Sequence, residues 1–173
     1  MNGGPYVESK ASASALRDAF NAREASVYVA ALQRYLGTSA DNSLGSGSFE
    51  TVYVLDRAAY PDAAHPSSAP EPRNGNPIRP DVQRRITAAL AGTTDLTFVA
   101  DRGSVVEDPK GCATVKNGGV LVTLGTLVGE GDEEHVAVSG FVTCLRATWL
   151  TYVVHRAGTG WTVTGTTGPY AVA

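Results

Sequence analysis

Apolar residues early in the chain recur with the period of an α-helix. One broad stripe with a 3.6-residue spacing is formed by Val27, Tyr28, Ala31, Leu32, Tyr35 and Leu36. Asn21 and Glu24 precede the stripe with the spacing of a capping box, and Gly37 directly follows it. The pattern predicts a helix over Ala22–Leu36 with this stripe buried. The Ala-rich stretch Ala11–Phe20 contains no helix breaker and is expected to be helical as well.

Beyond this helix, short runs of β-branched and aromatic residues are typical of strands. The expected strands are Thr51–Leu55, Asp95–Ala100, Cys112–Lys116, Val120–Val128, Val136–Arg146, Thr148–Arg156 and Trp161–Gly165. Asn117, Gly118 and Gly119 are a strong turn signal, so the strands on either side of them are expected to pair as a hairpin. Gly140 is a candidate β-bulge.

The segment Ala58–Pro80 carries six of the nine prolines of the chain. Because proline cannot donate a backbone hydrogen bond, no helix or ordinary strand is expected there, and the segment is predicted to be a long loop. Such a loop is either a lid over a binding site or a surface insertion without a function. After Pro80 the spacing predicts a short helix that ends at Gly92 and buries Val82, Ile86, Ala89 and Leu90.

The helices come early and the strands follow, which is the order of an α+β fold. We expect N-terminal helices packed on a bent antiparallel sheet of five to six strands. Residues 1–21 are expected to form a partly helical N-terminal extension. Residues 22–173 are expected to form one α+β domain that carries the Pro-rich loop at 58–80.

Four segments between about Glu24 and the C-terminus resemble an uncharacterised bacterial domain family: Tyr53–Arg57, Gly118–Gly125, Ala147–Val154 and Gly160–Gly168. That family implies no activity, so no catalytic residue is transferred from it. In architecture, the helices and the closing Gly-Trp-Thr-Val strand resemble the NTF2-like (SnoaL-like) superfamily, and the general shape is also similar to cystatin-like domains. The chain has no Asp-His or Asp-Arg pair that aligns with the catalytic positions of NTF2-like proteins, and likeness of fold does not define a function.

The composition fits one domain of 173 residues, of which 43% are hydrophobic and 18% are charged. Fourteen Lys and Arg against seventeen Asp and Glu give a net charge of -3, which supplies no positive field for a nucleic acid. No apolar run approaches the length of a transmembrane helix, and the first residues lack the basic flank and apolar core of a signal peptide. We therefore expect a cytoplasmic protein with no membrane span.

The two cysteines, Cys112 and Cys144, lie on predicted strands of one meander and are expected to be close in space. They have no Cys-x-x-Cys spacing and no neighbouring His cluster, so a zinc site is not expected. Without an export signal, two small buried thiols are the expected state. The alternative is a disulfide, which would argue for export to an oxidising compartment.

Two Asp-Arg pairs end predicted strands, and their carboxylates are the candidate catalytic groups. Asp56 shares a strand face with Val54, and Asp101 shares one with Val99. If these faces point inward, each carboxylate lies at the rim of a pocket, where burial raises its pKa and the neighbouring arginine lowers it, as for a general base. The alternative is that each aspartate only ends a strand and caps a loop amide or pairs at the surface.

The candidate ligand-binding residues are Arg146, Tyr28, Tyr53 and Tyr152. Arg146 shares its strand face with apolar residues, so it is expected to point to the apolar side and to require a carboxylate or an anionic ligand. A structural ion pair, or a strand end that reaches water, is the alternative. The tyrosines either fill the core or line a cavity for an apolar ligand.

Two functions are consistent with these residues. The first is a domain that binds an apolar metabolite in a pocket under the sheet, or transforms it as an isomerase or cyclase; whether the chain is an enzyme stays open. The second is a non-catalytic interaction or accessory domain that acts through its sheet surface as a homodimer, with Trp149 and Val153 on the contacting face. No cofactor motif, metal motif or nucleophile elbow accompanies the scattered histidines, His65, His135 and His155. A cavity under the sheet would favour the first function, and a filled core the second.

Overall fold

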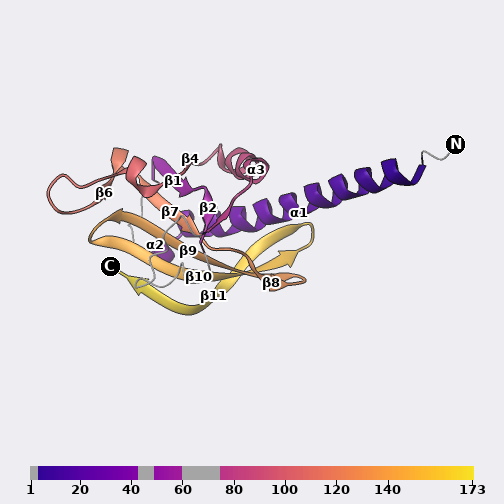
Figure 1. Ribbon diagram of the computed structural model, residues 1–173. Helices are drawn as coiled ribbons and strands as arrows, with labels where there is room; N and C mark the ends of the chain where they lie inside the picture. Colours follow the sequence, from indigo (N-terminus) through magenta and orange to yellow (C-terminus); the bar gives the residue numbers. More distant parts are fainter. Residues whose placement is uncertain (1–3, 43–48, 60–74) are drawn as a thin grey trace.

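Helices and a large curled sheet make up the fold, an α+β arrangement as expected (Figure 1). The structure, a computed structural model, describes residues 4–42, 49–59 and 75–173. The helices are α1 (Gly4–Gly37), α2 (Ser39–Asn42) and α3 (Pro80–Leu90), with short 3-10 helices η4 (Arg102–Ser104) and η5 (Lys116–Gly118). The strands are β1 (Thr51–Leu55), β2 (Arg57–Ala58), β3 (Asn76–Pro77), β4 (Asp95–Val99), β5 (Val106–Glu107), β6 (Thr114–Val115), β7 (Val120–Leu124), β8 (Val128–Glu130), β9 (Glu133–Thr143), β10 (Arg146–Ala157) and β11 (Gly160–Val172).

The first helix, α1, is one continuous element rather than a capped helix behind a separate extension. Asn21, the predicted N-cap of Ala22–Leu36, lies inside it, is buried, and donates from Nδ2 to the Asp81 carboxylate of α3. Neither Gly nor Pro interrupts this part of the sequence, so the helix continues through the capping-box spacing and does not begin there. Residues 12–20 are exposed, and the N-terminal half of α1 projects from the rest of the protein (Figure 1).

The sheet is mixed rather than wholly antiparallel. Its strand order is β11-β10-β9-β7-β1-β4. β1 pairs in parallel with both β4 and β7, whereas the β7–β9, β9–β10 and β10–β11 pairs are antiparallel. The parallel β1–β4 pair follows from the connection through α3, because a crossover helix brings the chain back to the starting end of the sheet.

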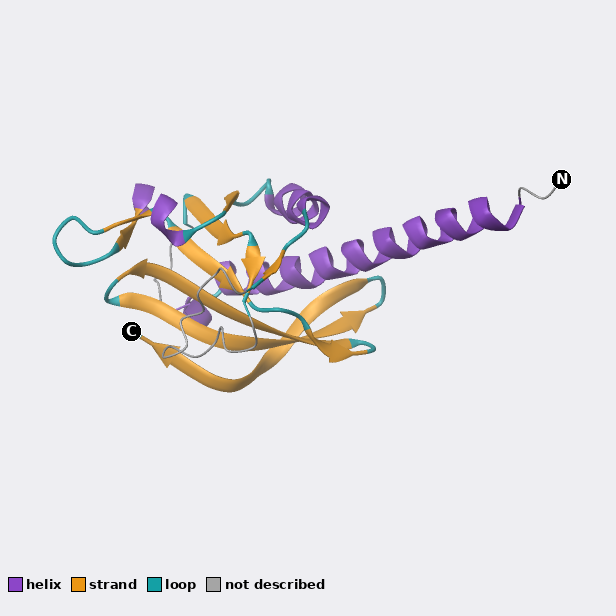
Figure 2. Cartoon of the chain, in the orientation of Figure 1, coloured by secondary structure: helices purple, strands orange, loops and turns teal. Residues whose placement is uncertain are grey.

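The helices α1 and α3 lie on one side of the curled sheet, and the main core lies between them and this inner face (Figure 2). The predicted stripe of α1 is buried at Val27, Tyr28, Ala31, Leu32 and Tyr35, whereas Leu36 is half-buried. α3 buries Val82, Ile86 and Leu90 as predicted. The prediction for Ala89 is wrong: it is exposed, because it faces an open groove beside α1 instead of the core.

The predicted hairpin between Cys112–Lys116 and Val120–Val128 is not formed. Asn117 and Gly118 do reverse the chain, with φ angles of 59° and 61°. However, β6 pairs with β5 and β9, and β7 pairs with β1 and β9. The turn signal is local and marks where the chain reverses, but packing decides which strands become neighbours. β5 and β6 form an arm over the outer face of the sheet, where Val105 and Val115 pack against Leu55 and Leu121.

A disulfide joins Cys112 to Cys144, whose Cα atoms lie 5.3 Å apart. The cysteines are therefore close in space, as predicted, but the expectation of two free buried thiols is wrong. The bond connects the loop before β6 to the β9–β10 turn. Beside it the Cys144 backbone N–H donates to the Ala113 carbonyl at 2.9 Å. Together these contacts attach the β5–β6 arm to the sheet.

The Pro-rich segment 58–80 is described only near its ends. There β2 and β3 pair Arg57 with Pro77 and Ala58 with Asn76, a short ladder where none was expected. Such a pairing tolerates proline because the ring removes only the N–H and leaves the carbonyl as an acceptor. Residues 60–74 lie outside the described residues, so the lid interpretation stays a prediction. Among the described helices, none has the length and apolar character needed to cross a membrane.

Candidate functional site

The space under the sheet is filled by side chains. Tyr28, Leu32 and Tyr35 of α1 meet Leu150 and Tyr152 of β10, and each of these five residues is at most 1% exposed. α1 therefore occupies the concavity in which a ligand cavity was expected. Two open grooves lie at the surface of α1.

The first groove lies between α1, α3 and β11 and has a volume of about 290 Å³. We call it the α1–β11 groove; it is lined by Ala22, Ala25, Ser26, Val29, Ala30 and Gln33 of α1, Arg85 and Ala89 of α3, and Trp161 of β11. A second groove of about 280 Å³ lies near the C-terminal end of α1, between Leu36, Phe49 and Leu90. None of the candidate site residues predicted from the sequence lines either groove.

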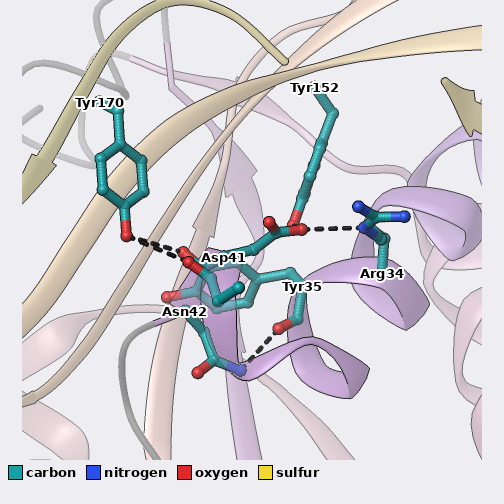
Figure 3. Close-up of polar contacts among 7 residues, drawn as sticks. Arg34, Tyr35, Asp41, Asn42, Tyr152 and Tyr170 are labelled. Atoms are coloured by element: carbon teal, nitrogen blue, oxygen red, sulfur yellow. Dashed lines mark hydrogen bonds and ion pairs between the residues drawn. The ribbon is translucent and has the colours of Figure 1, made fainter. Parts of the chain in front are cut away.

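A partly buried polar network lies at the C-terminal end of α1 (Figure 3). The Asp41 Oδ2 accepts from Tyr152 Oη at 2.9 Å and from Arg34 Nε at 2.9 Å. Asn42 is buried, and its Nδ2 donates to the Tyr35 carbonyl at 2.8 Å. The network ties α1 and α2 to β10 and leaves the Asp41 carboxylate, whose side chain is 16% exposed, with two strong donors.

The tyrosines of the inner face are held as neutral phenols. Burial raises the pKa of Tyr28 and of Tyr35 well above the ordinary value, and Tyr28 Oη donates to the Gly125 carbonyl at 3.0 Å. Burial also raises the pKa of Tyr152, and the hydrogen bond to Asp41 raises it further because that bond requires the phenolic proton. Tyr35 Oη shares a short hydrogen bond with Thr148 Oγ1. These hydroxyls have internal partners, as expected of core tyrosines.

Asp56 and Asp101 are brought to one edge of the sheet, because they follow the parallel neighbours β1 and β4. Asp101 is exposed, and its Oδ1 accepts from the Ser104 N–H at 2.9 Å as the N-cap of η4. Asp56 is half-buried, and its backbone N–H donates to the Val99 carbonyl at 2.9 Å. Asp101 therefore caps a backbone amide, as the alternative interpretation predicts. A catalytic role for either carboxylate stays a prediction.

The predicted ligand-binding residues are split between the two sides of the sheet. Tyr28 and Tyr152 are buried on the inner face, whereas Tyr53 packs in the cluster under the β5–β6 arm and accepts from Asn117 Nδ2 at 2.8 Å. The expected position of Arg146 on the apolar side is wrong, since it is exposed at the first residue of β10. The expectation treated Arg146 as part of the same strand as Val142 and Cys144, whereas β9 ends at Thr143 and the chain turns before β10, which breaks the alternation.

Two of the histidines meet on the outer face around Glu133. His135 Nε2 lies 2.9 Å from Glu133 Oε1, and His155 Nε2 lies 2.8 Å from Glu133 Oε2. These hydrogen bonds hold the pKa of the Glu133 carboxyl below its ordinary value. Within the residues that the structure describes, no group of three or more His, Cys, Asp or Glu side chains is placed to hold a metal ion.

The residues that line the α1–β11 groove carried no signal in the sequence. Arg85 and Trp161 lie far apart in the chain, and only the packing of the folded protein brings them together in the groove. Comparison with family models, curated proteins and solved structures gave no match for this chain. The likenesses to the bacterial domain family and to NTF2-like proteins therefore stay predictions.

Proposed function

We propose that this chain is a non-catalytic interaction domain that contacts a second copy of itself through the outer face of β10. The observation that carries the proposal is the filled concavity. Because α1 takes the place of a ligand under the sheet, the surface is what remains for binding. An apolar metabolite site under the sheet, with isomerase or cyclase activity, has less support for the same reason.

The outer face of β10 carries the apolar residues Trp149 and Val153 and borders the cluster of His135, His155 and Glu133. Trp149 and Val153 point away from α1, because the residues that alternate with them, Leu150, Tyr152 and Val154, are buried on the inner face. Both are half-buried, and among the described residues neither joins a hydrophobic core cluster. A tryptophan and a valine on the same strand face favour contact with another protein surface.

The disulfide supports localisation of the protein in an oxidising compartment. Disulfides persist outside the reducing cytoplasm and are rare within it. The Cys112–Cys144 bond therefore argues against the cytoplasmic location expected from the sequence. Mass spectrometry of the alkylated protein, purified from its source without reductant, tests this: protected cysteines support the proposal, and two alkylated thiols contradict it.

Sedimentation equilibrium tests the homodimer. The wild-type chain is expected to dimerise at micromolar concentrations, and Trp149→Glu is expected to shift it to the monomer by burying a charge at the contact. The control is Leu145→Glu, which places the same charge at a residue that is 77% exposed in the β9–β10 turn. A monomeric wild type, or equal effects of the two substitutions, would contradict the proposal.

A further inference from the structure

The last strand, β11, is an edge strand without charge. It pairs with β10 on one side and, among the described residues, with no strand on the other. None of its thirteen residues is charged. Proteins commonly protect such edges with lysine, proline or irregular backbone, and here Gly168, with a φ of 68°, and Pro169 interrupt the distal part. A register shift opposite Val153 and Val154 leaves Thr164 as an extra residue, so the regular edge is the part from Gly160 to Val163.

The hairpin geometry identifies the backbone groups on the free side of β11. Ala157 and Gly160 close a two-residue turn, so they form a hydrogen-bonded pair. Since such pairs alternate with non-hydrogen-bonded ones, Trp161 and Val163 direct their N–H and C=O groups away from β10. Their side chains point to the inner side, where both pack against the main core.

The α1–β11 groove adjoins this edge, and Trp161 belongs to both. Its floor is made of small residues, among them Ala22, Ser26 and Ala30 of α1. A strand added to β11 would send every second side chain toward α1, over this floor. A free strand edge beside a helix-lined groove is the arrangement by which folded domains bind extended peptides, with backbone hydrogen bonds for affinity and a groove for side chains.

The groove is rimmed by positive charge. Arg23 and Arg156 lie over the Trp161 ring, at 5.2 Å and 6.0 Å from its centroid, and each has an acidic partner. Arg85, in the opposite wall, forms no ion pair with any residue in the described part of the chain. A carboxylate on the bound segment would supply that partner.

We propose that the edge of β11 and the α1–β11 groove bind an extended peptide segment by strand addition, with small apolar side chains in the groove and a carboxylate at Arg85. This site differs from the outer face of β10 in position and in partner, so it goes beyond the proposed homodimer. A second copy pairing through its own β11 is the other occupant that the test must recognise.

Fluorescence anisotropy with the intact, disulfide-bonded chain tests the site. The probe is a labelled octapeptide of alternating Thr and Val that ends in Asp, and its two controls carry N-methyl groups on one or the other set of alternate amides. Strand addition requires that one N-methylated peptide lose binding while the other retains it, since only one set of amides faces β11. Equal binding of both controls, or no binding of the parent peptide at millimolar concentration, overturns the proposal.

Matched substitutions on α3 localise the binding. Ala89→Trp fills the groove and is expected to weaken binding about tenfold or more, whereas Ala88→Trp, at an exposed neighbour outside the groove, is expected to leave it unchanged. Arg85→Glu is expected to weaken binding of the Asp-ended peptide but not of an Asn-ended amide, and Arg84→Glu to weaken neither. Equal effects within either pair overturn the proposal.

Two further outcomes separate this site from the homodimer and from pairing of two β11 edges. Trp149→Glu is expected to change sedimentation without changing peptide affinity, so each proposal can fail alone. If Ala89→Trp instead abolishes a wild-type dimer, and the peptide competes with that dimer, then β11 of a second copy is the occupant and the peptide proposal is overturned.

Discussion

Gly140 of β9 lies directly against the ring of Tyr35 of α1. A Cβ at position 140 would stand 1.9 Å from Tyr35 Oη and 2.7 Å from its Cζ, so only glycine fits there. The bulge expected at Gly140 is absent, since its pairing with Val122 on β7 and Thr148 on β10 is regular. The glycine instead allows α1 to sit deep in the concavity, where Tyr35 joins the main core.

Gly140→Ala is expected to destabilise the fold by about 1–3 kcal/mol, because the added methyl forces Tyr35 out of its place. Urea denaturation measures the free energy of unfolding. Because the nearest atom is the hydroxyl, Tyr35→Phe in the same chain is expected to recover part of the loss. A double-mutant cycle with strictly additive effects would contradict the contact.

Leu32→Ala is expected to cost about 2–5 kcal/mol, since Leu32 is fully buried between α1 and the sheet. Leu16→Ala makes the same change on the same helix at a residue that is 72% exposed. The control is expected to change the free energy of unfolding by no more than about 0.5 kcal/mol. Thermal and urea denaturation of both variants provide the measurement, and near-neutral melting of Leu32→Ala would show that this stripe is not core.

The chain is expected to lose stability at alkaline pH because of its buried tyrosines. The pKa values of Tyr28, Tyr35 and Tyr152 are raised above the ordinary 10.0 in the folded state. Their contribution is therefore fully present below pH 10 and decreases as the pH rises toward the folded-state values. Absorbance at 295 nm should show these phenols ionising at the same pH at which circular dichroism shows unfolding. In Tyr152→Phe the rise in absorbance at this transition should be smaller by the contribution of one tyrosinate. Complete tyrosine ionisation in a chain that is still folded would refute this.

Removing the disulfide is expected to cost about 3–4 kcal/mol, since it closes a loop with a sequence separation of 32 residues. The paired substitution Cys112→Ser with Cys144→Ser avoids a mixed redox state. Hydrogen exchange should accelerate in the β5–β6 arm while the buried residues of β10 stay protected. A uniform increase across the sheet would show that the bond supports the whole fold rather than the arm.

Asp41→Ala is expected to cost about 1–3 kcal/mol, because it leaves the buried Tyr152 hydroxyl without its acceptor. Arg34→Ala removes the other donor of the same network but is expected to cost less, since the Arg34 side chain is 48% exposed. Urea denaturation of the two variants gives the comparison. Equal losses would mean that the ion pair, rather than the tyrosine, stabilises the network.

Much of the local structure could be predicted from the sequence. The stripe from Val27 to Tyr35, the short strand Thr51–Leu55 and the inner face of β10 depend on the period of apolar residues, which a helix or strand expresses wherever it lies. The proximity of Cys112 and Cys144 could also be predicted, because both belong to neighbouring segments of one sheet.

The pairing of the strands and the surfaces that are free to bind depend on the tertiary structure. Whether β1 lies parallel to β4 and β7, and whether β6 joins β7 or β9, depends on which faces become buried together, and no local pattern carries that information. The oxidation of the cysteines and the α1–β11 groove arise from contacts between residues far apart in the chain. A filled concavity and a groove at its rim are properties of packing, and for that reason the side of the sheet that is free to bind could be recognised only in the folded protein.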